Sequence, residues 1–254
     1  MTPDTPWHPV DWSIVGPAFL AGLLVLATHV PLGRQVLRKG IVFMDLAVAQ
    51  IAGLGVVLAS AMGFEAHGWE VQACAAGAAL AGAGALLAME RRWPDIQEAL
   101  IGVLFVLASS GAILLLANHP HGGEHLKDLL VGQILWVSPA QLQAMAALTA
   151  FLLLAWWRLP TRWRRAGFYV VFALAVTASV QLVGVYLVFS SLILPALAVR
   201  HLAPSGCSVA WAYGLGALAY GLGLTLSAMF DLPAGALVVV SMAGMCLIGA
   251  RPRP

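Results

Sequence analysis

The stretch EALIGVLFVLASSGAILLL, residues 98–116, is an almost unbroken apolar run whose only charge is Glu98 at its first position. A helix needs about 20 predominantly apolar residues to cross the hydrocarbon core of a bilayer. Runs of this kind recur along the chain, which is 61% hydrophobic and only 9% charged. Soluble domains carry about 25% charged residues. The sequence therefore predicts an all-α, polytopic helical membrane protein.

Polar, glycine and proline residues between the apolar runs divide the chain into about 8–9 transmembrane helices, which we expect to form one transmembrane domain over 1–254. The seventh run is short and carries Ser190, Ser191 and Pro195. We expect it to be a broken or half helix. The nine candidate spans are about 15–33, 41–62, 70–89, 97–117, 135–157, 167–188, 189–203, 207–229 and 233–250.

The distribution of Lys and Arg predicts the orientation, because these residues accumulate in cytoplasmic loops. With the N-terminus outside and the C-terminus cytoplasmic, only Lys127 of the 13 basic residues falls on the outer side. The basic residues expected on the inner side are Arg34, Arg38, Lys39, Arg91, Arg92, Arg158, Arg162, Arg164, Arg165, Arg200, Arg251 and Arg253.

The segment HPHGGEHLKDLLVGQ, residues 119–133, lies outside in this orientation and holds three of the seven histidines of the chain. Neutral imidazole is a common ligand of transition metals, so this loop is a candidate site for capturing a divalent metal. His125 is the leading ligand, because Asp128 follows it at a spacing that shares a helix face. The alternative is an ordinary solvated loop. The candidate ligands are His119, His121, Glu124, His125 and Asp128.

Asp45 and Gln50 are polar residues within the second span, where we place Asp45 about two turns from its start. Ionisable groups inside a membrane are costly and indicate function by default. Five residues rotate a helix by about 140°, so these two side chains do not share one face, although both could line a path between helices. Asp45 is either a metal ligand on such a path or the ion-pair partner of Arg38.

Other polar groups within the spans are candidates for a translocation path. Glu98 could act there or could stabilise the start of the fourth span, since a carboxylate is favourable at a helix N-terminus. Gln181 could bond between helices. It precedes the expected break at Ser190, Ser191 and Pro195, where freed carbonyl groups could line a cavity.

The chain contains no GxxxxGK[ST], HExxH or GxSxG motif. It therefore does not bind ATP through a P-loop, and two common hydrolytic sites are missing. No enzymatic activity, permanently bound cofactor or nucleic-acid partner is expected. Any energy source must be a separate ATPase chain or an ion gradient.

Four segments resemble, in matching order, the membrane subunit of the ABC importers for zinc, manganese and iron. They are VLRKGIVFMDLAVAQIAGLGVVLAS (36–60), EALIGVLFVLASSGAILLL (98–116), LLVGQILWVSPAQL (129–142) and VTASVQLVGVYLVFSSLILPALAVR (176–200). The resemblance implies a homodimeric permease in the cytoplasmic membrane of a bacterium, working by alternating access. It also implies two kinds of partner, a cytoplasmic ATP-binding subunit and an extracytoplasmic metal-binding protein.

The chain departs from this family in two places. The family's second helix has an Asp followed four residues later by a His, but here Asp45 is followed by Ala49 at that spacing, with Gln50 beside it. The family's ATPase-coupling segment is reduced here to the short, basic RLPTRWRRAGFY (158–169). Coupling would then use Arg158, Arg162, Arg164 and Arg165, or other loops such as 90–97.

Two other function classes compete with the metal importer. One is a transporter driven by an ion gradient, with Asp45 and Glu98 as proton sites. The other is a membrane metalloenzyme that uses the external His and Glu residues. Activity that persists without an ATPase partner would favour the first of these.

Overall fold

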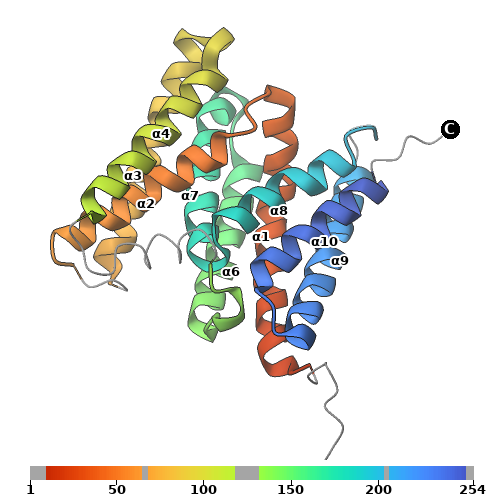
Figure 1. Ribbon diagram of the computed structural model, residues 1–254. Helices are drawn as coiled ribbons and strands as arrows, with labels where there is room; N and C mark the ends of the chain where they lie inside the picture. Colours follow the sequence, from red (N-terminus) through yellow and green to blue (C-terminus); the bar gives the residue numbers. More distant parts are fainter. Residues whose placement is uncertain (1–9, 65–67, 118–131, 203–205, 250–254) are drawn as a thin grey trace, which may run out of the picture.

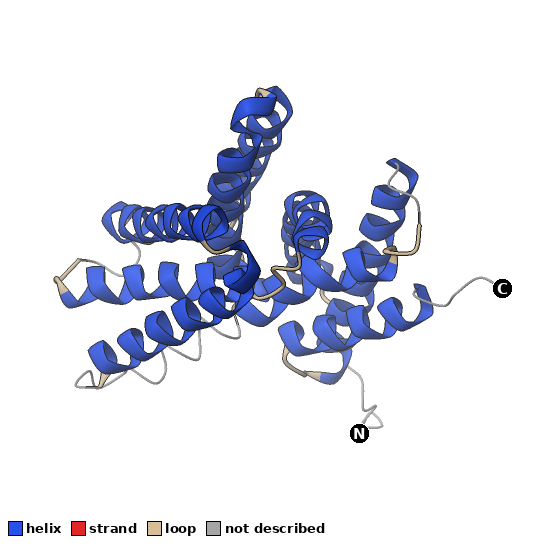
Figure 2. Cartoon of the chain, turned by 90° about the horizontal axis from the view of Figure 1, so that it is seen from above, coloured by secondary structure: helices blue, strands red, loops and turns tan. Residues whose placement is uncertain are grey.

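The computed structural model describes residues 10–64, 68–117, 132–202 and 206–249, and these residues form helices joined by short turns without any strand (Figure 2). The α-helices are α1 (Trp12–Lys39), α2 (Met44–Ala61), α3 (Trp69–Arg92), α4 (Gln97–Leu116), α6 (Pro139–Arg158), α7 (Arg164–Val183), α8 (Val185–Ala198), α9 (Gly206–Phe230) and α10 (Ala234–Gly249). Short 3-10 turns are η1 (Pro94–Ile96), η2 (Ile134–Trp136) and η3 (Thr161–Trp163).

Each expected span corresponds to one of these helices, which confirms the all-α polytopic class. Among the described residues, seven helical segments are long and apolar enough to cross a membrane, and α8 and α10 are shorter apolar helices. The start of α6 also differs from the expected span, which the sequence places from 135. The turn η2 comes first, and α6 begins only after Ser138, whose hydroxyl accepts the Gln141 N–H while the Gln141 side chain accepts the Ser138 N–H. This reciprocal cap fixes the start of the helix.

The helices are arranged as a central group flanked by two lateral groups (Figure 1). In that view α1, α6 and α7 stand in the centre, α2, α3 and α4 pack together on one side, and α8, α9 and α10 pack on the other. A continuous apolar core joins the groups, and its largest fully buried side chains include Tyr169, Tyr220, Phe168 and Phe172.

Exposed tryptophans mark the two ends of the helices. Trp12, Trp69 and Trp136 lie at the starts of α1 and α3 and in η2, with 69–76% of each side chain exposed. Trp93, Trp157 and Trp163 lie at the opposite ends, after α3 and at the junction of α6 and α7. Tryptophan is enriched at both membrane–water interfaces, so these two groups indicate the levels of the lipid headgroups.

Both ends of α1 are capped. The Asp11 carboxylate accepts hydrogen bonds from the Ser13 hydroxyl at 2.7 Å and from the Ser13 N–H at 2.9 Å. These bonds hold the pKa of Asp11 below its ordinary value. At the other end Gly40 adopts a left-handed conformation (φ 71°) that terminates the helix. Because α1 ends there, α2 starts at Met44, and Asp45 lies in the first turn of α2, not two turns inside it.

The seventh run forms the short helix α8, as expected of a half helix, but no break occurs at Ser190, Ser191 and Pro195, so that part of the prediction is wrong. These residues are inside the uninterrupted helix α8, and the chain breaks at Gly184, between α7 and α8. The hydroxyls of Ser190 and Ser191 donate to carbonyls one turn earlier, at 2.8 and 2.6 Å. Serines bonded in this way remain compatible with a helix. Gly184 has a backbone (φ 82°, ψ 161°) that only glycine adopts readily.

Glycine permits two close backbone approaches that hold the core together. At Gly33 in α1, an added Cβ would overlap the backbone carbonyl of Leu192 in α8. At Gly132, it would overlap the backbone of Val183 and Gly184 at the α7–α8 break. The segment that leads into η2 therefore packs directly on this break, and two segments 52 residues apart in sequence meet there.

Candidate metal path

Asp45 is a carboxylate buried among apolar helices. Its residue is 1% exposed, and neither of its side-chain oxygens has a hydrogen-bond partner within the described chain. The backbone N–H groups of Asp45 and Leu46 lie close enough to interact with the carboxylate, but neither reaches hydrogen-bond geometry. The Asp45 carboxylate forms no hydrogen bond with Arg38, whose side chain is exposed. The structure therefore does not show the ion pair that the sequence left open.

Glu98 brings a second carboxylate to the same place. It lies in the first turn of α4, and its Oε1 accepts the backbone N–H of Phe43, the N-cap residue of α2, at 3.1 Å. It thus caps α2, the neighbouring helix, although the sequence suggested a role at the start of its own helix. Its other oxygen, Oε2, is buried without a partner among the residues described. Because Phe43 is two residues before Asp45, the Glu98 carboxylate lies beside the first turn of α2, which contains Asp45.

Together Asp45 and Glu98 present three unpartnered carboxylate oxygens where α2 and α4 begin. Two acids next to each other in an apolar setting are costly unless a cation or a proton compensates them. The starts of two helices lower this cost, because their N-terminal dipoles favour negative charge. The arrangement can hold a divalent cation transiently. It is not a closed site, because within the described ranges no three His, Cys, Asp or Glu side chains come together.

The other proposed path residues do not join this pair. Gln50 is half-buried in α2, about 7.5 Å further along the helix axis than Asp45. Gln181 is half-buried near the end of α7. Ser191 shares a hydrogen bond of 2.9 Å with the Tyr220 hydroxyl, which ties α8 to α9. Pro195 is buried within α8. The hydrogen bonds of the two serine hydroxyls are thus made to the backbone of α8 and, for Ser191, also to Tyr220 of α9.

Five of the proposed metal ligands lie in 118–131, outside the described residues. They are His119, His121, Glu124, His125 and Asp128.

A buried histidine, His29, was not recognised as a candidate from the sequence. His29 is 0% exposed, about 15 Å from the end of α1, and its Nδ1 lies 2.9 Å from the Val25 carbonyl oxygen. Its Nε2 has no partner among the described residues. The available signal was the helical spacing of His29 with Leu26 and Gly33, which face the core. Because His29 lies far from the end of α1, it is a buried polar group separate from the Asp45–Glu98 pair.

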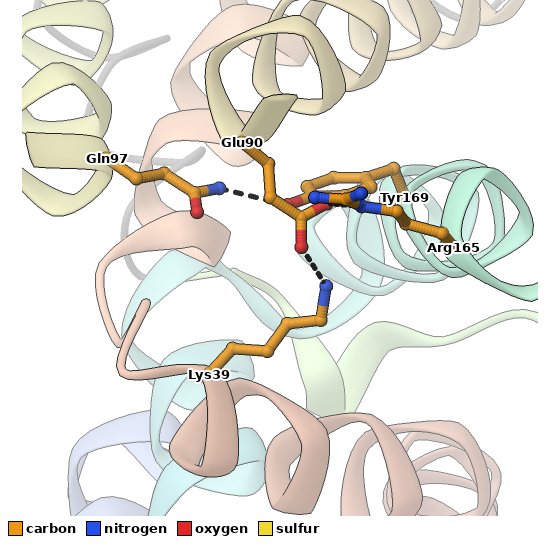
Figure 3. A network of polar contacts seen from close by, with 5 residues as sticks. All are labelled: Lys39, Glu90, Gln97, Arg165 and Tyr169. Atoms are coloured by element: carbon orange, nitrogen blue, oxygen red, sulfur yellow. Dashed lines mark hydrogen bonds and ion pairs between the residues drawn. The ribbon is translucent and has the colours of Figure 1, made fainter. Parts of the chain in front are cut away.

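The four arginines proposed to couple to an ATPase differ in their surroundings. Arg165 donates to Glu90 Oε2 at 2.8 Å, and Lys39 binds Glu90 Oε1 at 2.6 Å (Figure 3). Arg158, Arg162 and Arg164 are exposed. No separate helix stands between α6 and α7, where the chain forms only the turn η3.

The network around Glu90 links four helices at this end of the molecule. Glu90 near the end of α3 binds Lys39 of α1 and Arg165 of α7, and Gln97 of α4 donates to the Tyr169 hydroxyl at 2.9 Å. The Lys39 ammonium also lies 5.2 Å from the centre of the Tyr169 ring, within the range of a cation–π interaction. Figure 3 shows these side chains converging between the helices. A displacement of segment 90–97 or 158–165 would therefore be transmitted through this network to all four helices, α1, α3, α4 and α7.

Solved structures provide the fold comparison. PsaBC from Streptococcus pneumoniae in complex with Fab matches with a TM-score of 0.76 at 22% identity, covering 95% of this chain and 92% of that chain. A protein described as a metal-chelate type ABC transporter in an inward-facing conformation matches with a TM-score of 0.63 at 18% identity, covering 92% and 84%. Among curated proteins no sequence matches.

The family comparison extends over nearly the whole chain. The model of the ABC 3 transport family matches residues 11–159 and 157–251. These ranges include both carboxylates, the Glu90 network and the α7–α8 break. This chain therefore belongs to the ABC 3 transport family.

Proposed function

We propose that this chain is the membrane-spanning permease subunit of an ATP-driven importer of divalent metal ions, working by alternating access. The observation that carries the proposal is the Asp45 carboxylate, which is buried and unpartnered beside Glu98 in a multi-pass membrane protein of a transport family. An ionisable group in such a place marks an ion path by default. A passing metal ion supplies the compensating charge that the described residues do not.

The proposed route uses two kinds of ligand. The external loop 119–133 offers imidazole groups, and the α2–α4 pair offers carboxylate oxygens at the opposite end of the helices. A site of imidazole and carboxylate groups suits zinc, whereas a site of carboxylates alone suits manganese. We favour zinc over manganese because the entry loop is rich in histidine. Gln50 and Gln181 are the polar groups that we place along the route between these ends.

The proposed assembly has three further components. A cytoplasmic ATP-binding subunit docks on 90–97 and 158–165, where Arg158 and Arg162 are exposed and Arg165 connects to Glu90. An extracytoplasmic metal-binding protein delivers the ion, and a second copy of this chain completes the path. The chain acts as a single permease domain in the cytoplasmic membrane of a bacterium.

Reconstitution tests this function. The chain is co-expressed with the ATP-binding and metal-binding proteins encoded beside it, and zinc and manganese uptake into proteoliposomes is measured together with ATP hydrolysis. Uptake should require ATP and should stop when the ATP-binding subunit carries an inactivated Walker A lysine. Uptake that continues with this inactive subunit but stops when the proton gradient is dissipated would instead establish the gradient-driven transporter.

The orientation can be checked by labelling single cysteines from outside intact cells, in a variant that lacks Cys74, Cys207 and Cys246. Cysteines in 119–133 should react with a membrane-impermeant maleimide, and cysteines in 158–166 should react only after the membrane is permeabilised. The positive-inside distribution of Lys and Arg is the reason for this expectation. Labelling of both segments from the same side would contradict the orientation.

The histidine loop yields a graded expectation. His125→Ala should impair uptake at limiting metal much more than His119→Ala or His121→Ala, because His125 can share a ligand set with Asp128. Since imidazole binds metal only when neutral, the difference between wild type and the His125 variant should shrink below about pH 6. Uptake assays at two metal concentrations measure this. Wild-type uptake by the triple His→Ala variant would show that the loop has no role in capture.

A further inference from the structure

A basic cavity lies at the end of the molecule where α1, α3 and α6 finish. It measures about 770 Å³ and is lined by residues of α1, α3, α6, α7 and α9. Its volume is in the range of ligand pockets, about 300–1,000 Å³. A second cavity of about 370 Å³ adjoins the other side of α1, and Arg34 and Arg38 line both.

The charges around the two cavities are strongly unbalanced. Glu90 is the single acidic residue among the lining residues, and it is already bound to two of the cations, Lys39 and Arg165. The other lining cations form no ion pair with any described residue; these are Arg34, Arg38, Arg164 and Arg200. Three of these guanidinium groups line each cavity, because Arg34 and Arg38 are shared. Such a set favours an anion with several oxygens, and phosphate fits the fork of donors that each guanidinium presents.

Apart from Gln35, the uncharged lining of the larger cavity carries no polar side chain. Trp156, Phe168 and Val209 contribute to the larger cavity, together with Pro31 of α1. Pro31 lies eight residues before the end of α1, so the cavity reaches about 12 Å along the helix from its charged rim. A ligand that fills it needs a charged end at the rim and an apolar portion below.

The level of the rim in the membrane is given by the exposed tryptophans. Trp157 and Trp163 are 77% and 57% exposed and lie at the α6–α7 junction, next to the arginines of the larger cavity. Such residues lie at the depth of the lipid headgroups. The cavity therefore opens where phospholipid phosphates are found.

We propose that these cavities form a binding site for an anionic phospholipid, with its phosphate held by Arg34 and Arg38 and its glycerol and upper acyl portion against Trp156, Phe168 and Val209. In the orientation inferred above, the lipid comes from the inner leaflet. The transported cation is not the ligand, because the uncompensated positive charge repels it. An acidic segment of the ATP-binding subunit would match the rim but not the apolar interior.

The test uses the full-length chain purified in neutral detergent, with native mass spectrometry to count bound lipid. Dioleoylphosphatidylglycerol is compared with dioleoylphosphatidylcholine, and glycerol 3-phosphate is added alone as the soluble phosphate probe. The variants are Arg34→Gln with Arg38→Gln, the charge-conserving Arg34→Lys with Arg38→Lys, and the matched control Arg91→Gln with Arg92→Gln. The control removes the same charge at the same end of the molecule, outside the cavity lining.

The wild type should prefer phosphatidylglycerol, and the double Gln variant should lose about 30-fold in affinity for it, because each basic residue against an anionic lipid contributes about fivefold. The Lys variant and the Arg91/Arg92 control should keep most of the preference. A preference that persists in the double Gln variant overturns the proposal. Equal binding of glycerol 3-phosphate alone would also overturn it, because the site would then be one for soluble phosphate.

The assembled transporter provides one more arm. If the ATP-binding subunit displaces the lipid on assembly and the preference disappears, the basic cavity is a protein docking site and the lipid proposal is wrong. Retention of the lipid in the complex supports it. Neither result depends on which metal is transported, and the lipid preference of the purified chain is measured without any partner, so it can hold even if the proposed transport function fails.

Discussion

Replacing Asp45 with asparagine is expected to reduce metal uptake by about 10–100-fold or more, the range seen when groups that hold or orient a metal are lost. The substitution keeps the size of the side chain and removes its charge. The fold should survive, because the native carboxylate has no partner to lose in the described chain and a neutral amide is less costly to bury. Uptake into proteoliposomes and the thermal unfolding temperature in detergent measure the two effects separately.

Asp231→Asn is the matched control, because Asp231 is exposed in the turn between α9 and α10, outside the segments assigned to the metal path and to ATPase docking. It should leave uptake unchanged. Combining Asp45→Asn with Arg38→Gln provides a further check, since the structure shows no bond between these residues. Restored uptake in that double variant would show that Asp45 serves only to balance Arg38 and would remove it from the path.

The second large effect is expected at Gly33, where replacement by alanine should lower the stability of the protein by about 1–3 kcal/mol, the usual cost of overpacking a core. The added methyl group would overlap the Leu192 carbonyl, which is backbone and cannot rotate away. Helices α1 and α8 would have to separate. The loss should appear although alanine is intrinsically the better helix former by about 1 kcal/mol. Thermal unfolding and the yield of monodisperse protein measure it.

Gly16→Ala in the same helix is the control, because no atom lies within 4 Å of the position that its Cβ would take. It should be neutral or slightly stabilising. If both substitutions behaved alike, the α1–α8 approach would not be as close as described.

The existence and class of the helices could be predicted from the sequence, because the requirement for about 20 apolar residues leaves a direct trace in composition. The position of the α7–α8 break could not. Ser190, Ser191 and Pro195 carry the usual signals of a helix break, but the serines bond to their own helix and the proline is tolerated within it. The true break depends on Gly184 meeting Gly132, a tertiary contact between segments far apart in sequence.

Only part of the candidate site could be predicted from the sequence, because single residues are visible there but contacts between distant segments are not. Asp45 and Glu98 stand out individually, because charges are rare within apolar runs. Their meeting depends on α2 and α4 beginning side by side, which no local pattern encodes. His29 was overlooked because a single histidine in an apolar helix resembles an ordinary core residue. The Glu90 network shows the same limit, since its members come from four helices.

The shortness of α8 has a consequence for how the protein is made. Its 14 residues extend about 21 Å, whereas the hydrocarbon core is about 30 Å thick. A segment of that length is a poor independent substrate for membrane insertion, and it follows α7 without a surface loop. Its principal neighbours are α1, synthesised first, and α10, the last of the described helices to leave the ribosome. The packing around α8 is therefore completed late in synthesis, when α10 is made and α8 becomes enclosed between α1 and α10. A nascent chain interrupted before Ala234 would leave uncovered the side of α8 that packs against α10.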